Sequence, residues 1–425
     1  SEIVAALLVP PRCPQRRFAM GDDLFYAAVV IGTLLGAAAL RAVPLPHRAA
    51  ASSAFGTLLL CAGCREQLVY PLVGVGLTFL VLRTWPREWH GAGCFLAAFG
   101  WLLTLRTFYQ IRGPTNAVNL MLTLKMVAVG FGSQEGGAAA AASAREVLLY
   151  FSCHHGLLTG PHFSVREWRD ALVARGPVLL PPAEVRRRAA RALLGTVLCA
   201  AVWVGTARWL PFAYVRSEAF AALPAAARYG YFFVSSFSYR YRFYTPWLLT
   251  EAAGLLLGFE APANVALSGT ELCAKPSDYI AAWNTSVQRW LKAHVYRRVP
   301  LRSRAGRALA TLVASAVWHG VRPGYYLFFF GVFLMTLVER LCAAAAAASP
   351  SLGALGRARW WPLVGYAWTM SAFTFFGAAF NALSLDDTRA AWAAVDHAGW
   401  WLLALPLPPC ALALALGRRA REKDA

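Results

Sequence analysis

The chain has 425 residues and a formal net charge of +20, and 58% of its residues are hydrophobic while only 15% are charged. Soluble domains carry about 25% charged residues, so the composition excludes an ordinary soluble protein. It favours a membrane protein whose short basic connectors orient the chain and attract anionic lipid or a phosphate-rich substrate.

The first 19 residues contain prolines, arginines and one apolar run that is too short to cross a bilayer. We interpret residues 1–19 as an N-terminal extension that is disordered or not native. We expect one membrane domain over residues 20–425, with its first span directly after Met20.

Apolar runs separated by Gly, Pro and charged residues predict an all-α, polytopic membrane protein. The predicted spans cover residues 24–43, 49–64, 68–82, 92–105, 115–131, 148–158, 189–207, 229–237, 246–259, 308–318, 325–341, 363–380 and 399–416. The Gly- and Ala-rich residues 132–145 predict a flexible connector. Long hydrophilic segments are confined to residues 161–188 and 261–278, so we expect the active site within or at the edge of the helix bundle.

His319 is the first candidate catalytic residue. It ends the apolar run 308–318 and is followed by the helix breakers Gly320, Pro323 and Gly324. An ionisable side chain at membrane depth is costly and therefore indicates a functional site. A neutral imidazole can take a proton from an alcohol that attacks a thioester and return it to the thiolate. The alternative is a core histidine whose nitrogens are satisfied by its neighbours.

Asn284 is the second candidate, in an aromatic-flanked segment directly after Trp283. An asparagine amide can hold either the acceptor hydroxyl or the thioester carbonyl, and it can donate a hydrogen bond to the negative charge that develops. Asn284, Thr285 and Ser286 also form a glycosylation sequon, which is a second interpretation of the same residues.

Several further residues are candidates for substrate binding or for the tunnel wall: Trp283, Trp318, Arg240, Arg242, Tyr244 and Ser315. Arginine binds phosphate with fixed geometry, although aromatic and basic residues also form ordinary interfacial belts. Thr311 and Ser315 lie at steps of four before His319, where they orient its ring or bond the backbone. We expect no metal, because His154, His155 and His162 lack a convincing ligand spacing and partner.

Trp283-Asn284 and Trp318-His319-Gly320, with the spacing between them and the Pro-Gly-Tyr-Tyr segment that follows, resemble the signature of the membrane-bound O-acyltransferase family. The resemblance extends to its lysophospholipid acyltransferase branch. The further segments that carry it are residues 20–26, 115–118, 122–125, 159–163, 240–244 and 258–259.

This resemblance implies a bundle of about eleven helices around a catalytic tunnel, with His319 as the catalytic histidine and Asn284 as its partner. It implies an acyl-CoA substrate that enters from the cytosol, a lysophospholipid that arrives through the bilayer, and no cofactor. The location would be the endoplasmic reticulum membrane and the role phospholipid remodelling. The favoured acceptor is lysophosphatidylinositol and the favoured donor arachidonoyl-CoA, although the short stretch between Gly258 and Trp283 departs from the branch that acylates this acceptor.

Two alternatives stay open. In the first, the same fold acylates a different acceptor: another lysophospholipid, a sterol or a peptide serine. In the second, the chain is a transporter or channel in which His319 and Asn284 line a permeation path. Many transporters show internal repeats, and none is visible in this sequence. We expect no nucleic-acid partner.

Overall fold

The computed structural model describes residues 19–136, 142–174, 181–260 and 262–423, and every regular element among them is a helix. This confirms the all-α prediction. Six segments are long and apolar enough to cross a membrane: Leu45–Thr84, Arg87–Phe108, Pro182–Arg216, Pro323–Ala348, Trp361–Ala382 and Ala398–Gly417. The count of about eleven helices around a tunnel stays a prediction, and the extension 1–19 lies almost entirely outside the described residues.

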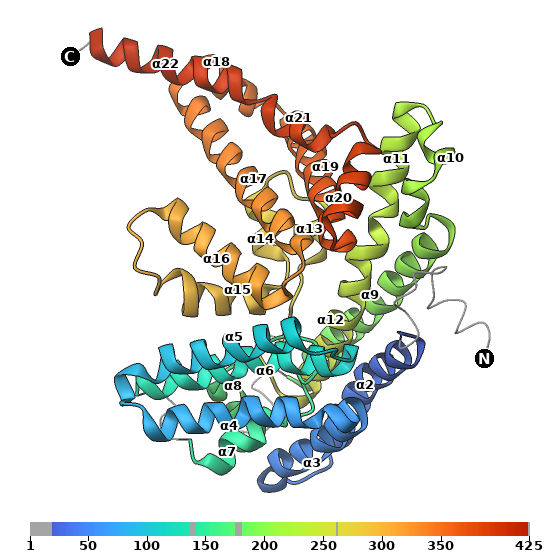
Figure 1. Cartoon of the computed structure of the whole chain (residues 1–425), viewed down its shortest axis with the longest axis vertical. Helices are drawn as coiled ribbons and strands as arrows, with labels where there is room; N and C mark the ends of the chain where they lie inside the picture. The colour runs from blue at the N-terminus through green and yellow to red at the C-terminus, as the bar shows by residue number, and fades with distance from the viewer. Residues whose placement is uncertain (1–18, 137–141, 175–180, 261, 424–425) are drawn as a thin grey trace.

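The chain builds the molecule in three stages (Figure 1). The first comprises α2 (Ala19–Leu40), α3 (Leu45–Cys64), η1 (Arg65–Leu68), α4 (Val69–Thr84), η2 (Arg87–Trp89), α5 (His90–Phe108), α6 (Gly113–Gln134), α7 (Ala144–Phe151), α8 (Val165–Arg169) and η3 (Asp170–Ala174). The second comprises α9 (Pro182–Trp209), η4 (Phe212–Arg216), α10 (Glu218–Ala221), α11 (Ala225–Ser235), α12 (Phe237–Leu257), α13 (Leu267–Glu271), α14 (Pro276–Ala282), α15 (Thr285–Leu291), η5 (Lys292–Tyr296) and α16 (Arg304–His319). The third comprises α17 (Pro323–Ala348), α18 (Pro350–Gly356), α19 (Trp361–Ala382), α20 (Leu385–Ala393), α21 (Ala398–Ala404) and α22 (Leu407–Lys423).

Three predicted boundaries are wrong. The span over 148–158 does not form, because α7 ends at Phe151 and Gly156 and Gly160 adopt positive φ in the loop that follows. The span over 246–259 begins earlier, since α12 starts at Phe237 and continues through Pro246. Membrane proteins tolerate such a proline where neighbouring groups satisfy the freed backbone. The connector over 132–145 is shorter than predicted, because α6 reaches Gln134 and α7 starts at Ala144, and residues 137–141 lie outside those described.

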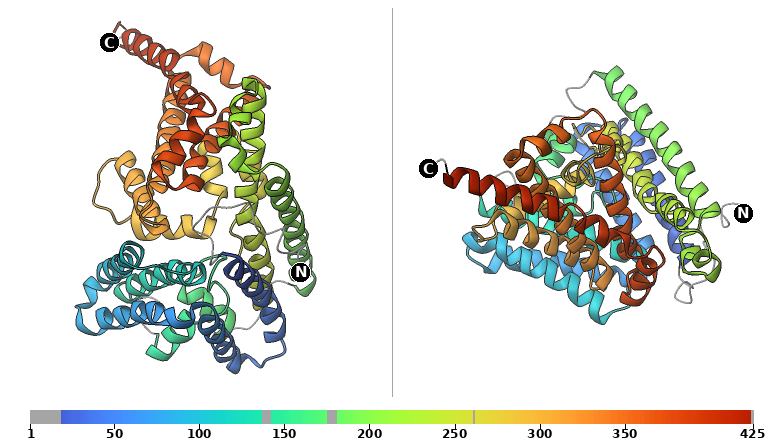
Figure 2. Two further views of the ribbon diagram at one scale, coloured as in Figure 1. Left: turned by 45° about the vertical axis from the view of Figure 1, so that its right-hand side comes forward. Right: turned by 90° about the horizontal axis from the view of Figure 1, so that it is seen from above.

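The helices pack around two apolar cores. The N-terminal core lies among α5, α6, α7 and α8 and takes Trp290 and Trp318 from the middle of the chain. The C-terminal core lies among α11, α14, α17, α19 and α20, with Phe373, Phe375 and Phe376 of α19 at its centre. In both figures α9 and α12 run side by side along one edge, and α15 and α16 lie between the α4–α6 layer and the α17–α22 group (Figures 1 and 2). The segment with both candidate catalytic residues therefore lies where the two cores meet.

Candidate active site

His319 is the last residue of α16, and the predicted break after it is confirmed. Gly320 has φ 153° and ψ −173°, a conformation that favours glycine. A Cβ at this position would also lie 2.8 Å from the Tyr325 ring. Glycine thus allows the chain to turn sharply from α16 into α17, and it leaves the imidazole at a helix end.

Aromatic rings surround the His319 side chain. Ring centroids lie 4.8 Å away for Trp318, 4.9 Å for Phe380, 5.5 Å for Phe329 and 5.7 Å for Tyr325. The residue is half-buried, and its ring nitrogens form no hydrogen bond with any described residue. Both ring nitrogens of His155 also lack such partners, but His155 is fully buried, whereas the half-buried imidazole of His319 at a helix end is available to a substrate.

Arg106 holds the end of α16 in place, and no motif in the sequence indicated this role. From α5, its guanidinium donates to the carbonyl oxygens of Trp318 and, at 3.4 Å, Val317. Its Nε and Nη2 donate to Oδ1 of Asn116 on α6 at 3.1 and 3.0 Å. The last carbonyls of a helix lack partners within the helix and carry partial negative charge, so a cation placed here stabilises the end of α16.

Positive charge also gathers around Tyr325, whose ring faces His319. Arg106, Arg242 and Arg322 all lie within electrostatic range of its hydroxyl. Arg242 and Arg322 are exposed. The field beside His319 therefore favours a substrate that carries phosphate.

Asn284 caps α15 in an unusual conformation. Its backbone is left-handed, with φ 45° and ψ 51°, which asparagine tolerates better than most residues. Its Oδ1 accepts a hydrogen bond of 2.8 Å from Nδ2 of Asn264. Its own Nδ2 forms no hydrogen bond with the described residues, which leaves two donors for a ligand.

Asn264 is a second residue that sequence reasoning missed as part of the site. It is only 1% exposed. Its carbonyl accepts from the Thr285 amide at 2.9 Å, and its Oδ1 accepts from the amide and the hydroxyl of Ser286. One buried side chain thus fixes the whole turn that begins α15. The sequon alternative loses support, because Asn284 pairs with this buried residue and Ser286, the hydroxyl residue of the sequon, is itself buried and donates to Asn264 Oδ1.

The candidate residues on α12 form a separate buried cluster. Nε and Nη2 of Arg240 donate to the two carboxylate oxygens of Glu271 at 2.8 and 3.0 Å, and the Tyr244 hydroxyl donates to the same carboxylate at 2.7 Å. Trp283 packs beside them, with ring centroids 5.4 Å from Tyr244 and 5.7 Å from Tyr279. Arg240 and Tyr244 are therefore occupied with Glu271 of α13, and their role in substrate binding stays a prediction.

The remaining candidates lie on or beside α16. Trp318 is 7% exposed, and its Nε1 donates to the Leu120 carbonyl of α6 at 3.0 Å. Ser315 is buried one turn before His319, while Thr311 donates to the Arg307 carbonyl and so bonds the backbone. Among the described residues, no group of three or more His, Cys, Asp or Glu is placed to hold a metal ion.

No hydrogen bond joins His319 and Asn284, but one helix anchors both segments. Trp318 next to His319 bonds the Leu120 carbonyl, and Trp290 of α15 bonds the Leu124 carbonyl at 3.0 Å. These acceptors lie one turn apart on α6. The ends of α15 and α16 are thus held against a common support, which suits a pair of residues acting on one substrate.

Comparison with known proteins identifies the family of the chain. Residues 78–383 match the family model of MBOAT, the membrane-bound O-acyltransferase family. The chain is 29% identical over 434 residues to the human membrane-bound acylglycerophosphatidylinositol O-acyltransferase MBOAT7, covering 88% of this chain and 90% of that protein. The mouse protein of that name is 28% identical over 88% of this chain and 89% of its own length. Lysophospholipid acyltransferase 1 of Arabidopsis thaliana is 26% identical over 72% of this chain and 75% of its length. The chain therefore belongs to the membrane-bound O-acyltransferase family and is a multi-pass membrane acyltransferase.

Proposed function

We propose that this acyltransferase transfers an acyl chain from acyl-CoA to the free glycerol hydroxyl of a lysophospholipid, with lysophosphatidylinositol as acceptor and arachidonoyl-CoA as donor. The observation that carries the proposal is the aromatic-lined imidazole of His319, with both ring nitrogens free, at a helix end between two packed cores. The names of the mammalian relatives support the inositol headgroup. The endoplasmic reticulum membrane is the proposed location, where the reaction serves phospholipid remodelling.

The mechanism requires only groups that this chain supplies. His319 takes the proton of the acceptor hydroxyl as the oxygen attacks the thioester carbonyl. The carbon–oxygen bond of the new ester forms, the carbon–sulfur bond breaks, and the imidazolium returns the proton to the departing thiolate. The free Nδ2 of Asn284 donates to the carbonyl oxygen while negative charge develops there. Attack is direct, in a ternary complex, and no acyl-enzyme forms.

The positive field near Tyr325 supports the substrate class. Acyl-CoA and a lysophospholipid both carry phosphate, and Arg242 and Arg322 are exposed beside the residue that faces His319. With a sterol or a peptide serine as acceptor, acyl-CoA alone would supply the phosphate for this field. Another lysophospholipid carries the same phosphate, and the Arabidopsis relative is named for lysophospholipids in general. A lysophospholipid with a different headgroup is therefore the second candidate acceptor.

A panel of acceptors tests the proposal. Purified protein in lipid nanodiscs is given radiolabelled arachidonoyl-CoA with lysophosphatidylinositol, lysophosphatidylcholine, lysophosphatidylethanolamine, lysophosphatidylserine or a serine peptide. We expect the highest kcat/KM with lysophosphatidylinositol. A preference for another headgroup would contradict the proposed acceptor but leave the proposed reaction, acyl transfer to a lysophospholipid, in place. Transfer to the peptide alone would overturn the lysophospholipid class.

Arg106→Gln is expected to lower kcat with little change in KM for either substrate. The substitution removes the donors that hold the Val317 and Trp318 carbonyls, and a reacting group displaced by an ångström loses about 100-fold in rate. Steady-state kinetics in both substrates measure this. Arg106→Lys keeps the charge and should recover part of the loss. The matched control is Arg83→Gln, at an exposed arginine in the last turn of α4, which should retain parental kinetics. A rise in KM alone would show that Arg106 binds substrate rather than positioning His319.

A further inference from the structure

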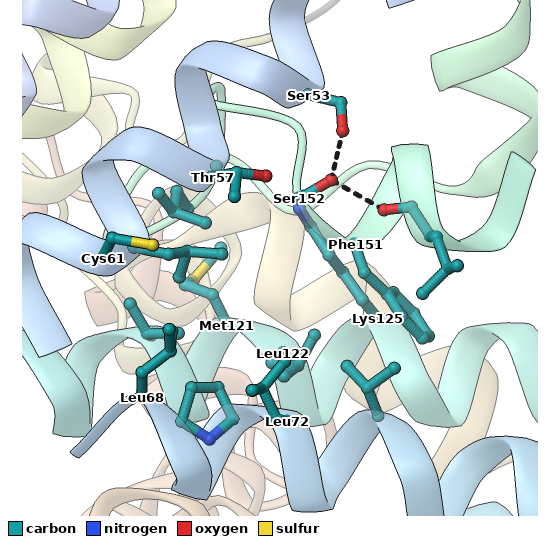
Figure 3. Close-up of a pocket in the computed structure, with 17 residues that line it drawn as sticks. Ser53, Thr57, Cys61, Leu68, Leu72, Met121, Leu122, Lys125, Phe151 and Ser152 are labelled. Carbon is teal, nitrogen blue, oxygen red and sulfur yellow. Dashed lines mark hydrogen bonds between the residues drawn. The ribbon is translucent and has the colours of Figure 1, made fainter. Parts of the chain in front are cut away.

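A cavity lies away from the candidate active site, among α3, α4, α6, α7 and the loop after α7 (Figure 3). Its volume is about 310 Å³, at the small end of the range for ligand pockets. Leucine, valine, methionine and phenylalanine side chains form most of its wall. None of its lining residues belongs to α15, α16 or α17. It therefore lies apart from His319.

The unusual residue in this wall is Lys125 of α6, which is 1% exposed. Its Nζ donates to the Tyr150 carbonyl at 3.2 Å and lies 5.2 and 5.0 Å from the ring centroids of Tyr150 and Phe163. No carboxylate of the described residues forms an ion pair with it. A buried ammonium without a counter-ion is unfavourable, and carbonyl and aromatic contacts offset only part of that cost.

The other groups around Lys125 do not supply the missing charge. The titratable side chains within electrostatic range are the Cys153 thiol and the imidazoles of His154, His155 and His162. Cys153 is within 3.3 Å of the Ser52 hydroxyl, and His154 Nδ1 is 2.8 Å from the same hydroxyl. Imidazoles are neutral or positive, so none of the three acts as an anion. The site is thus short of one negative charge.

Thr57 and Leu72 form the exposed edge, or mouth, of the cavity. Both lie on the segment Leu45–Thr84, which is long and apolar enough to cross a membrane. Leu72 is 59% exposed, and neighbouring Leu58 is 68% exposed. Surfaces of this kind meet lipid acyl chains, so a ligand enters from the hydrocarbon layer. Ser53 and Ser152, bonded to each other, also lie in the wall, together with Thr57 and Cys61 (Figure 3).

We propose that this cavity binds a free long-chain fatty acid, whose carboxylate pairs with the Lys125 ammonium while its chain follows the apolar wall to the mouth. The carboxylate supplies the counter-ion that the protein lacks, and the hydrocarbon fills the remaining space. Fatty alcohols, fatty esters and the acyl chains of phospholipids match the wall but not the charge. The inference is independent of the acceptor proposed for the active site.

Photolabelling of the protein in nanodiscs tests the proposed fatty-acid site. A diazirine analogue of oleic acid is expected to label peptides of α3, α4 and α7, and its methyl ester to label them about 10- to 100-fold less, since a hydrogen bond to a charged group has that effect on affinity. Lys125→Met should lower labelling by the acid to the level of the ester. Lys292→Met, the same change at an exposed lysine, should leave it unchanged.

Thermal unfolding shows whether Lys125→Met folds. If it does not fold, a second variant still tests the proposed fatty-acid site. Thr57→Trp fills the mouth and should abolish labelling by the acid, while Leu80→Trp, an exposed position on α4 outside the wall, should not. Equal labelling by acid and ester overturns the proposal. So does labelling that persists in folded Lys125→Met or in Thr57→Trp, or that maps to α16 and α17.

Discussion

His319→Ala is expected to lower kcat for acyl transfer by about 10²- to 10⁴-fold, the range for loss of a general base. The KM values should change little, because the imidazole acts on the proton only as the transition state forms. Single-turnover transfer of radiolabel from acyl-CoA to the lysolipid measures the chemical step directly. Glycine at 320 and the aromatic rings are untouched by the change, so α16 should still end at the same place.

The matched control is His294→Ala. His294 is also partly buried among aromatic rings, with ring centroids 5.3 Å from Phe131 and 5.2 Å from Trp290, but it lies on η5. It should lose stability without a comparable loss of kcat. If His319→Ala folds and transfers label at the parental rate, His319 is not the base. If both variants lose activity equally, the effect is structural.

Asn284→Gly is expected to lower kcat by about 10²- to 10³-fold, as removal of an oxyanion donor does. Glycine removes the amide yet keeps the left-handed backbone that this turn requires, with φ 45°. The rate of ester formation at saturating substrates is the measurement.

Asn284→Ala separates the two roles of this residue. It removes the same amide and adds backbone strain of about 1–2 kcal/mol, so it should unfold at a lower temperature than Asn284→Gly while showing a similar kcat. Equal stability of the two variants would mean that the turn does not depend on the left-handed conformation. A parental kcat in Asn284→Gly would exclude the amide from the chemistry.

Apolar runs were sufficient to predict where most long helices lie. The expected spans 92–105 and 363–380 correspond to α5 and α19 within a few residues, and both helices lie in segments long and apolar enough to cross a membrane. The expected span 115–131 also forms a helix, α6, but α6 is not among those segments. These predictions succeed because hydrocarbon accepts only backbone whose polar groups are bonded within a helix. The end of α16 was also predictable, since Gly320, Pro323 and Gly324 together forbid its continuation.

The support around the site was not predictable, because it depends on contacts between distant parts of the chain. Arg106 meets Trp318 more than two hundred positions later, and Asn264 meets Asn284 across the whole of α13 and α14. Local patterns carry no sign of such pairs. The sequence also indicated a phosphate-binding role for Arg240, because its contact with Glu271 could not be predicted. Glu271 lies in residues 261–278, for which the sequence predicted only a hydrophilic segment.

The position of His319 between two cores affects how the enzyme responds to stress. Trp318 belongs to the N-terminal core. Phe380, which contacts the His319 ring, lies on α19 directly after Ala379 of the C-terminal core. A small slip of one core against the other displaces the imidazole while every helix stays formed. Proteins open locally at lower free energy than they unfold. We therefore expect heat or harsh detergent to abolish acyl transfer before the helices unfold. Circular dichroism measures helix content and would not detect this loss of activity.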